Sequence, residues 1–128
     1  MAGEFACSNR LINQIHHNAL WTFLCSLQGI PQDAAEREER VAWLGDTGFV
    51  WEDYIYNIDM AAFTAKWLWD IRDTQRMTGE LAVTAPKWRR SGQVGPRYAP
   101  YPCWIGTYPL LTWFAYEYYG DMRVLRAH

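Results

Sequence analysis

The residues between Ile30 and Gly48 combine side chains that can carry out acid–base chemistry. The stretch IPQDAAEREERVAWLGDTG contains two arginines, one tryptophan and the carboxylates Asp33, Glu36, Glu38, Glu39 and Asp46. When like charges lie close together, the pKa of one member rises, which can keep a carboxylic acid protonated near neutral pH. Such an acid can donate a proton to a leaving oxygen, and an indole can stack on the apolar face of a sugar ring. The segment is therefore a candidate loop for cleaving a glycosidic bond.

A purely structural interpretation of the same segment is also open. Glu36 and Arg40 are four residues apart, the spacing at which opposite charges pair on a solvated helix face. The sequence WLGD favours chemistry instead, because Gly45 would let the backbone turn sharply and bring Asp46 back beside the earlier carboxylates. Glycoside hydrolysis with inversion needs two carboxylates about 6.5 to 9.5 Å apart. The residue pattern alone does not choose between the two interpretations.

The composition predicts one folded domain. The chain has 128 residues, of which 50% are hydrophobic and 16% aromatic, unlike the composition of disordered chains. The formal net charge is -2 and the basic residues are scattered, so nucleic acid is not an expected partner. No stretch approaches the roughly 18 apolar residues of a membrane span, and no signal-peptide pattern opens the sequence. We therefore expect no membrane partner and a cytoplasmic location.

Neither a metal site nor a cofactor is expected. Cys7, Cys25 and Cys103 are an odd number without a CxxC pair, which argues against a disulfide framework and against a zinc site. We expect three reduced thiols, two of them packed in the interior. His16 and His17 are adjacent and cannot share one helical face as metal ligands.

Apolar residues recur at three- and four-residue steps along most of the chain, which predicts helices. The predicted helices run from Asn9 to Leu27, from about Asp46 through Ile55, from Asp59 to Gly79, from Trp104 to Gly120, and from Asp121 onward. Residues 80–102 show no period and hold four of the six prolines, which predicts a long functional loop. No useful strand alternation appears. We therefore expect an all-α fold of about four to five helices.

The last predicted helix, MRVLRAH, is very short. Isolated helices of that length are marginal in water, which suggests a piece of a larger α-domain. A frayed final helix of a complete small bundle explains the same pattern. Both interpretations stand on spacing alone.

Several stretches resemble one enzyme family, in the family's order and over nearly all of residues 5–128. They are FACSNRLINQIHHNALWT, GIPQDAAEREERVAWLGDTG, YNIDMAAFTAKWLWDIRDTQ, TAP and WFAYEYYGDMRVLRAH. The chain is similar to the opening part of the catalytic domain of bacterial α-L-rhamnosidases, glycoside hydrolase family 78. The resemblance implies a six-hairpin (α/α) barrel with the sugar bound among loops at one end. Residues 1–128 would then be a single partial catalytic domain, about the amino-terminal third of the barrel.

The resemblance assigns roles in the loop after the first helix, where the family typically reads Thr-Asp-Cys-Pro-Gln-Arg-Asp-Glu-Arg-Leu-Gly-Trp-Thr-Gly-Asp. It implies that Glu39 is the general acid and that Asp33 and Asp46 hold the hydroxyls of the terminal deoxysugar. Trp43 would line the sugar pocket. The partners of the carboxylates would be Arg37 and Arg40, which fix the loop.

Trp88, which follows TAP, has two interpretations: a wall of the pocket or a plain core tryptophan. Ala34 and Ala35 replace the family's usual Cys-Pro, and Ile105 and Gly106 follow Trp104 where the family often has Gly and then Asp or Ser. These departures leave the charged positions intact and bear on which glycoside is cleaved.

The resemblance implies hydrolysis of terminal α-L-rhamnosides with inversion, and hence a rhamnose-containing glycoside as partner. The family takes its general base from a glutamate far downstream that no residue here matches. The available carboxylates are better interpreted as surface or helix-capping groups; they are Glu52, Asp53, Asp59 and Glu117. We therefore expect the isolated chain to have little activity. The alternative is a non-catalytic helical fragment that binds carbohydrate or a protein partner, and a partial barrel would expose an apolar surface prone to self-association.

Overall fold

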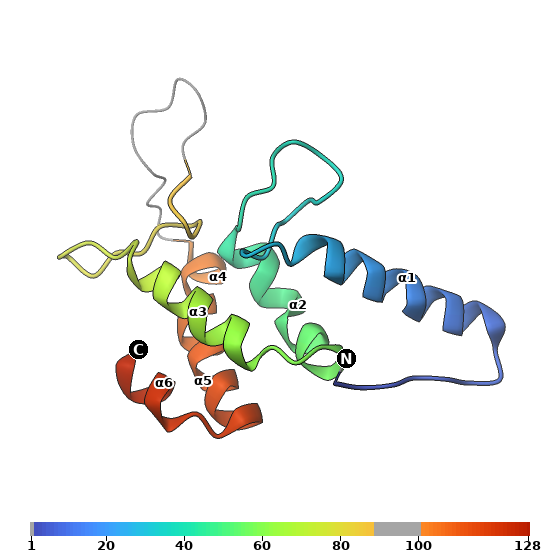
Figure 1. Cartoon of the computed structure of the whole chain (residues 1–128). Coiled ribbons are helices and arrows are strands. Elements are labelled where there is room, and N and C mark those ends of the chain that lie inside the picture. The colour runs from blue at the N-terminus through green and yellow to red at the C-terminus, as the bar shows by residue number, and fades with distance from the viewer. Residues whose placement is uncertain (1, 89–100) are drawn as a thin grey trace.

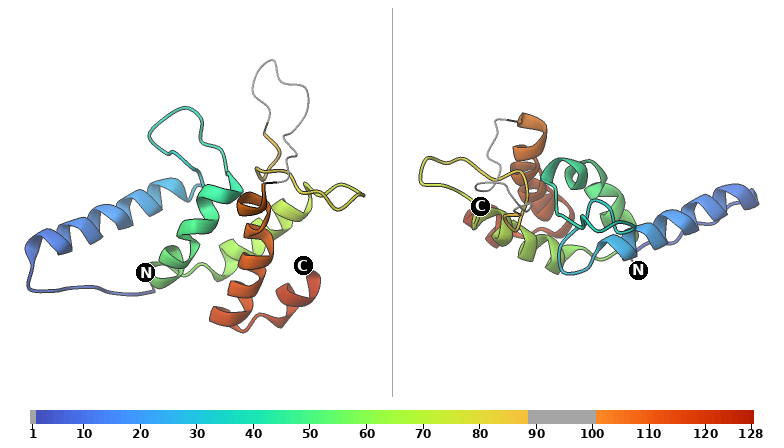
Figure 2. Two further views of the ribbon diagram at one scale, coloured as in Figure 1. Left: turned by 180° about the vertical axis from the view of Figure 1, so that it is seen from behind. Right: turned by 90° about the horizontal axis from the view of Figure 1, so that it is seen from above.

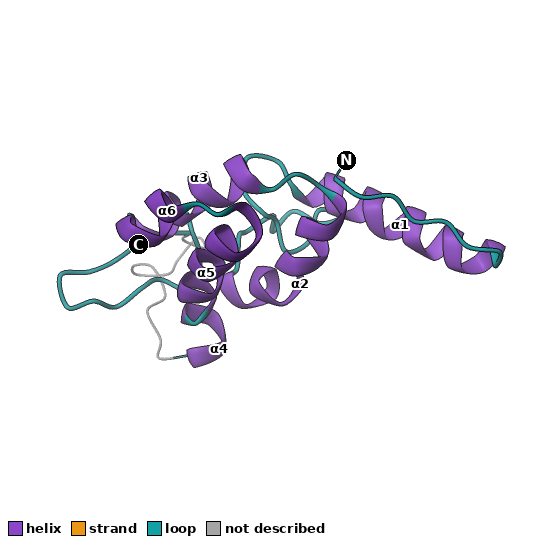
Figure 3. Ribbon diagram, turned by 90° about the horizontal axis from the view of Figure 1, so that it is seen from below, coloured by secondary structure: helices purple, strands orange, loops and turns teal. Residues whose placement is uncertain are grey.

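The computed structural model describes residues 2–88 and 101–128, in which the regular secondary structure is helical and loops connect the helices (Figure 3). The helices are α1 (Arg10–Ser26), α2 (Leu44–Asn57), α3 (Ala61–Arg72), α4 (Pro102–Ile105), α5 (Thr107–Tyr119) and α6 (Met122–Ala127). Extended pairing within these ranges is limited to the isolated bridges Leu27–Pro31 and Trp43–Thr84. The predicted all-α class is confirmed. Residues 89–100, most of the predicted long loop, lie outside the described ranges.

Helices α2, α3 and α5 form the body of the molecule, with α6 folded back against α5 (Figure 1). Two connections, residues 27–43 and residues 73–88 (the segment after α3), emerge at the same end of these helices, as Figure 2 also shows from behind. Helix α1 extends away from the body. The shared end of the two connections is where the candidate site forms.

Two stacked tryptophans form the centre of the core. Trp51 of α2 and Trp67 of α3 are fully buried, with ring centroids 5.1 Å apart and an interplanar angle of 21°. Each indole N–H has a partner, since Trp51 donates to the Thr64 hydroxyl at 3.1 Å and Trp67 donates to the Ala85 carbonyl at 2.9 Å. Buried indoles need such partners, because an unpaired polar group in the interior is costly. The second bond ties the core to the segment after α3.

Capping side chains set the helix starts that the sequence predicts. The Asn9 side chain accepts from the first amides of α1, and the Asp121 carboxylate accepts from those of α6. The Asp59 carboxylate likewise accepts from the amide of Ala61 at 3.1 Å, where α3 begins. Gly120 ends α5 in the left-handed conformation, with φ 64°, which a residue without a Cβ adopts readily.

Two predicted helix ends are wrong. Helix α2 begins at Leu44, earlier than predicted, because its amide donates at 2.9 Å to the carbonyl of Val83, a partner far away in sequence. Helix α3 ends at Arg72 rather than continuing to Gly79. Gly79 instead has φ 91° in a turn that Arg76 and Glu80 close with a backbone hydrogen bond of 2.9 Å.

The helix predicted from Trp104 to Gly120 is divided into α4 and α5 at Gly106. Pro109 lies in the first turn of α5. A proline has no N–H to donate to the carbonyl four residues earlier, so the helical ladder cannot run unbroken from Ile105 into α5.

The apolar stripe predicted on α1 is mostly exposed. Its carboxyl-terminal end packs on the body, where Phe23 lies 4.6 Å from Tyr54 between ring centroids. The rest leaves an exposed α1 face made of Leu11, Ile12 and Ile15, and Trp21 and Leu24 are exposed at other positions around the helix. All three cysteines are exposed, so the expectation that two are packed is wrong. None of the described helices is long and apolar enough to cross a membrane.

Candidate functional site

The loop between α1 and α2 is closed on itself by Asp33 and Val41. The Asp33 amide donates to the Val41 carbonyl at 2.9 Å, and the Val41 amide donates to Asp33 Oδ1 at 3.0 Å. The Asp33 side chain is only 6% exposed. A buried carboxylate of this kind is stable because hydrogen bonds and an ion pair satisfy its oxygens. Asp33 therefore fixes the shape of the loop as well as presenting a carboxylate.

Glu39 lies within this loop and has a donor on each carboxylate oxygen. The Trp43 indole Nε1–H donates to Oε1 at 3.0 Å, and Arg37 Nη2 lies 3.1 Å from Oε2. The same Arg37 nitrogen lies 3.5 Å from Asp33 Oδ2, so one guanidinium bridges the two carboxylates. The Arg37 side chain is 61% exposed, whereas that of Glu39 is 30% exposed. The loop thus holds its charges at one place without burying them completely.

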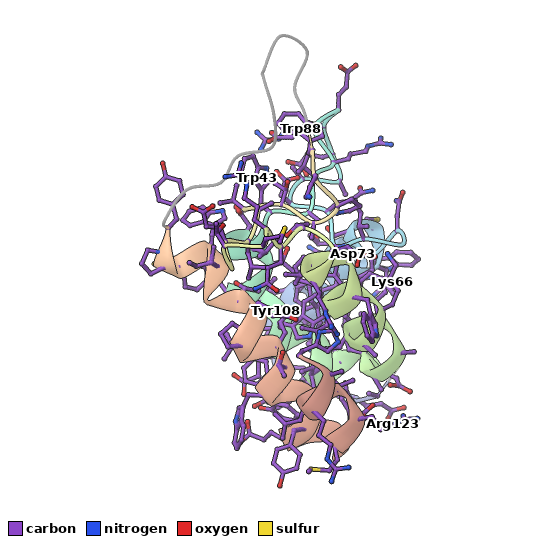
Figure 4. The ribbon with its side chains drawn as sticks, turned by 90° about the vertical axis from the view of Figure 1, so that its left-hand side faces the viewer. Trp43, Lys66, Asp73, Trp88, Tyr108 and Arg123 are labelled. Atoms are coloured by element: carbon purple, nitrogen blue, oxygen red, sulfur yellow. The ribbon has the colours of Figure 1, made fainter. Side chains whose placement is uncertain are left out.

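Backbone hydrogen bonds clamp this loop to the segment after α3. The Leu44 amide donates to the Val83 carbonyl, and the Ala85 amide donates to the Ala42 carbonyl at 3.1 Å. Trp43 lies between these two bonds. Figure 4 shows Trp43 and Trp88 at the same end of the molecule, and their ring centroids are 6.3 Å apart with the planes at 62°.

A pocket of about 340 Å³ opens beside the clamped segments, and α4 supplies part of its wall. Its lining residues are Asp33, Arg37, Glu39, Trp43, Asp46, Val83, Tyr101 and Trp104. The structure therefore brings Glu39 together with Arg37 and with the three predicted sugar-binding residues Asp33, Trp43 and Asp46. Aromatic walls and convergent polar groups are the usual features of a small-molecule site.

Two predicted site residues lie elsewhere. Arg40 is exposed, does not line the pocket, and forms no ion pair with a carboxylate among the described residues, so the structure does not place it in the network that Arg37 forms. Its backbone has φ 46°, an uncommon conformation for a residue with a side chain. Trp88 is half-buried and contacts Trp43 from outside the residues that line the pocket.

Sequence reasoning gave no site role to three of the lining residues, Val83, Tyr101 and Trp104. Their rings or side chains reach the pocket from segments about 40 to 60 residues beyond the loop. Tyr101 and Trp104 adjoin each other, with ring centroids 5.9 Å apart. Val83 and Tyr101 belong to residues 80–102, the segment that the sequence predicts to be a functional loop, and Trp104 lies just beyond it.

The predicted role of Gly45 as a sharp turn is wrong. Gly45 is buried inside the first turn of α2 and has no positive φ. Asp46 reaches the pocket because the helix begins beside the loop, with its carboxylate in the first turn, where the helix dipole favours a negative charge. What Gly45 provides is space, since the Trp104 indole lies directly against it.

The site offers carboxylates, one guanidinium and indoles, which can transfer protons, form hydrogen bonds and stack on a ligand. Among the described residues, no group of three or more His, Cys, Asp or Glu side chains could hold a metal ion.

Comparison with known proteins identifies the family. Residues 1–128 match the bacterial alpha-L-rhamnosidase 6 hairpin glycosidase domain. The chain belongs to this family. The resemblance seen in the sequence is therefore confirmed.

Relatives of this chain resemble it in sequence and in fold. It is 34% identical to an alpha-L-rhamnosidase of Formosa agariphila, over 98% of this chain and 14% of the relative. A solved alpha-L-rhamnosidase structure from Dictyoglumus thermophilum matches with a TM-score of 0.86 and 42% identity, over 99% of this chain and 14% of that one. The Streptomyces avermitilis enzyme, solved in complex with L-rhamnose, matches with a TM-score of 0.83 and 31% identity, over 97% and 12%. The chain thus spans a small part of the relatives that it matches.

Proposed function

We propose that this chain forms the acid-bearing part of a glycosidase that cleaves terminal α-L-rhamnosides. The observation that supports this most directly is the shared pocket of Asp33, Glu39, Trp43 and Asp46. A relative with a very similar fold is described in complex with L-rhamnose. The sugar would lie in this pocket, with its apolar face against an indole and its hydroxyls hydrogen-bonded to Asp33 and Asp46.

In the proposed mechanism Glu39 is the general acid. It donates a proton to the glycosidic oxygen as the bond to the anomeric carbon breaks. Glu39 Oε1 accepts a hydrogen bond from Trp43 and Oε2 forms an ion pair with Arg37, so one of these two contacts must open before that oxygen can pass a proton to the substrate. Arg37 is the group able to leave, because it is the more exposed partner and already contacts Asp33. Trp43 would stay and keep the carboxyl group oriented.

The proposed inverting reaction also needs a base on the opposite face of the sugar. Four other carboxylates were considered from the sequence, and none of them lines the pocket; they are Glu52, Asp53, Asp59 and Glu117. Glu52 accepts hydrogen bonds from Tyr56 and Tyr118, and Asp59 accepts from the start of α3. We therefore propose that the base is supplied from outside these residues. The isolated chain should lose at least the roughly 10² to 10⁴-fold contribution of that base.

Two measurements test this proposal. The purified 128 residues should show no turnover of an aryl α-L-rhamnoside; turnover that Glu39→Gln abolishes would contradict the missing base. L-Rhamnose should shift the NMR signal of the Trp43 indole N–H, whereas D-glucose should not. Asp33→Asn should weaken that response. Glu38→Gln is the matched control, because Glu38 is exposed and does not line the pocket, and it should leave the response unchanged.

The exposed α1 face supports a second candidate function, that of a non-catalytic interaction fragment. Exposed apolar surface of this kind usually marks an association site. We propose that it mediates self-association of the isolated chain. Sedimentation velocity should then show species larger than the monomer, and Ile15→Glu should reduce them. Gln14→Glu adds the same charge at a neighbouring exposed polar position and should not. A clean wild-type monomer at high concentration would exclude this function.

A further inference from the structure

The first turn of α2 packs directly against one wall of the pocket. A Cβ atom built on Gly45 would lie 2.5 Å from Cδ2, 2.6 Å from Cε2 and 3.0 Å from Cγ of Trp104. These three atoms belong to the body of the indole, and real Cβ atoms do not approach other atoms so closely. The indole of Trp104 therefore occupies the space that any side chain at position 45 would need.

We infer that Gly45 is a positioning residue for the pocket, acting through Trp104. The inference rests on the proposed function, because Trp104 matters to binding only if the pocket holds the sugar. Gly45 does not line that pocket and touches no substrate. Its contribution is to let the indole lie against the α2 backbone, which sets the distance between Trp104 and the carboxylate loop.

Helix α2 cannot move away to make room, because its start is fixed from two sides. The Leu44 amide is bonded to the Val83 carbonyl at 2.9 Å, and the Leu44 carbonyl accepts from the buried Thr107 hydroxyl at 2.8 Å. Trp104 belongs instead to α4, a single turn with no fully buried residue. A side chain at position 45 would therefore displace Trp104 and α4 rather than α2, and the pocket would lose its fitted wall.

Gly48 provides a matched control one turn further along α2. A Cβ there would lie 2.2 Å from Oγ1 of Thr107 and 3.1 Å from its Cβ. An alanine at Gly48 therefore creates a comparable overlap in the same helix. Gly48 does not contact Trp104 in this way and does not line the pocket. Neither glycine has a positive φ, so alanine introduces no backbone strain at either position.

The first experiment needs no sugar. With 5-fluorotryptophan at the eight tryptophan positions, the ¹⁹F signal that disappears in Trp104→Leu identifies Trp104. Gly45→Ala should shift this signal strongly, and Gly48→Ala should shift it less, because its added methyl group overlaps the Thr107 hydroxyl rather than the indole. An unchanged Trp104 signal in Gly45→Ala would overturn the inference, whatever the protein binds.

The second experiment titrates each variant with L-rhamnose. Gly45→Ala should weaken binding at least about tenfold, because small displacements of positioning groups have large effects, and Gly48→Ala should weaken it less, because its overlap does not fall on the indole. Equal affinities for Gly45→Ala and the wild type would overturn the role of Trp104 as a fitted wall. If the wild type itself does not bind L-rhamnose while the ¹⁹F signal still shifts, the proposed sugar is wrong and the positioning role of Gly45 stands.

A double variant protects the test against a failure to fold. Trp104→Leu removes the indole that overlaps the added methyl group, so Gly45→Ala combined with Trp104→Leu should recover the stability lost by Gly45→Ala alone. It should not recover L-rhamnose affinity, because the wall is gone. Additive stability changes in this double-mutant cycle would show that the two residues do not interact and would overturn the inference.

Discussion

Replacing Trp67 by phenylalanine tests whether the core stabilises the backbone hydrogen bonds that join residues 42–44 to residues 83–85 beside the pocket. The indole is fully buried, is stacked on Trp51 and donates to the Ala85 carbonyl at 2.9 Å. Ala85 in turn donates its amide to Ala42, next to Trp43. Trp67→Phe keeps an aromatic ring in α3 but removes the donor and part of the stacked surface.

The expected loss of stability has two parts. Leaving the Ala85 carbonyl without its buried donor costs about 1–3 kcal/mol. The smaller ring leaves a gap beside Trp51 that costs about 1–2 kcal/mol more, because cores relax only partly around missing atoms. Together they predict a decrease of about 3 kcal/mol in the free energy of unfolding.

Equilibrium unfolding in urea, followed by far-ultraviolet circular dichroism, measures this loss. Trp69→Phe is the control, since Trp69 lies in the same helix with 49% of its surface exposed, and it should cost less than about 1 kcal/mol. A decrease below about 1 kcal/mol for Trp67→Phe, or one equal to that of Trp69→Phe, would refute the reasoning. The Ala85 amide should also exchange its hydrogen faster in Trp67→Phe, because its segment is no longer held from the core.

Three further predictions concern other parts of the fold. Asn9→Ala removes the side chain that accepts hydrogen bonds from the first amides of α1. The variant should destabilise that helix by about 1 kcal/mol, and amide hydrogens in its first turn should exchange faster. Unchanged exchange would contradict the capping role of Asn9. Thr107→Val removes the 2.8 Å hydrogen bond to the Leu44 carbonyl and should lower the free energy of unfolding by about 1 kcal/mol, whereas Thr78→Val, at an exposed position, should not. Burial, and next the positive charge of Arg72, lower the pKa of His128, so the folded state favours the neutral ring. The contribution of His128 to the free energy of unfolding is therefore present above about pH 6.5 and is lost as the pH falls through the lowered pKa. Urea unfolding at several pH values should show a weaker dependence of the free energy of unfolding on pH in His128→Phe. An unchanged pH dependence would contradict this prediction.

Local interactions explain which parts of the fold were predictable. The caps of α1 and α6 depend on a side chain and amides within three residues of it. The Glu39–Trp43 and Asp33–Arg37 contacts span four residues each. Such short-range features can be found from spacing and from the family pattern, which is why the carboxylate loop was identified before the fold was known.

Long-range packing explains the errors. Helix α2 begins at Leu44 because the Val83 carbonyl satisfies its first amide, and no nearby residue signals that partner. The apolar stripe of α1 was predicted because its period is helical, but periodicity identifies an apolar face without naming what covers it. Gly45 was taken for a turn residue because glycine often serves turns, whereas its actual neighbour is 59 positions away at Trp104.

The sequence by itself determined the helical class, most helix starts, the family and the carboxylates of the candidate site. The tertiary structure alone decided that Val83, Tyr101 and Trp104 complete the pocket and that one guanidinium bridges two carboxylates. The physical reason is the range of the interactions. Caps and periodic faces depend on neighbours along the chain, whereas a pocket is the space left where distant segments pack, and its shape depends on every contact that holds them.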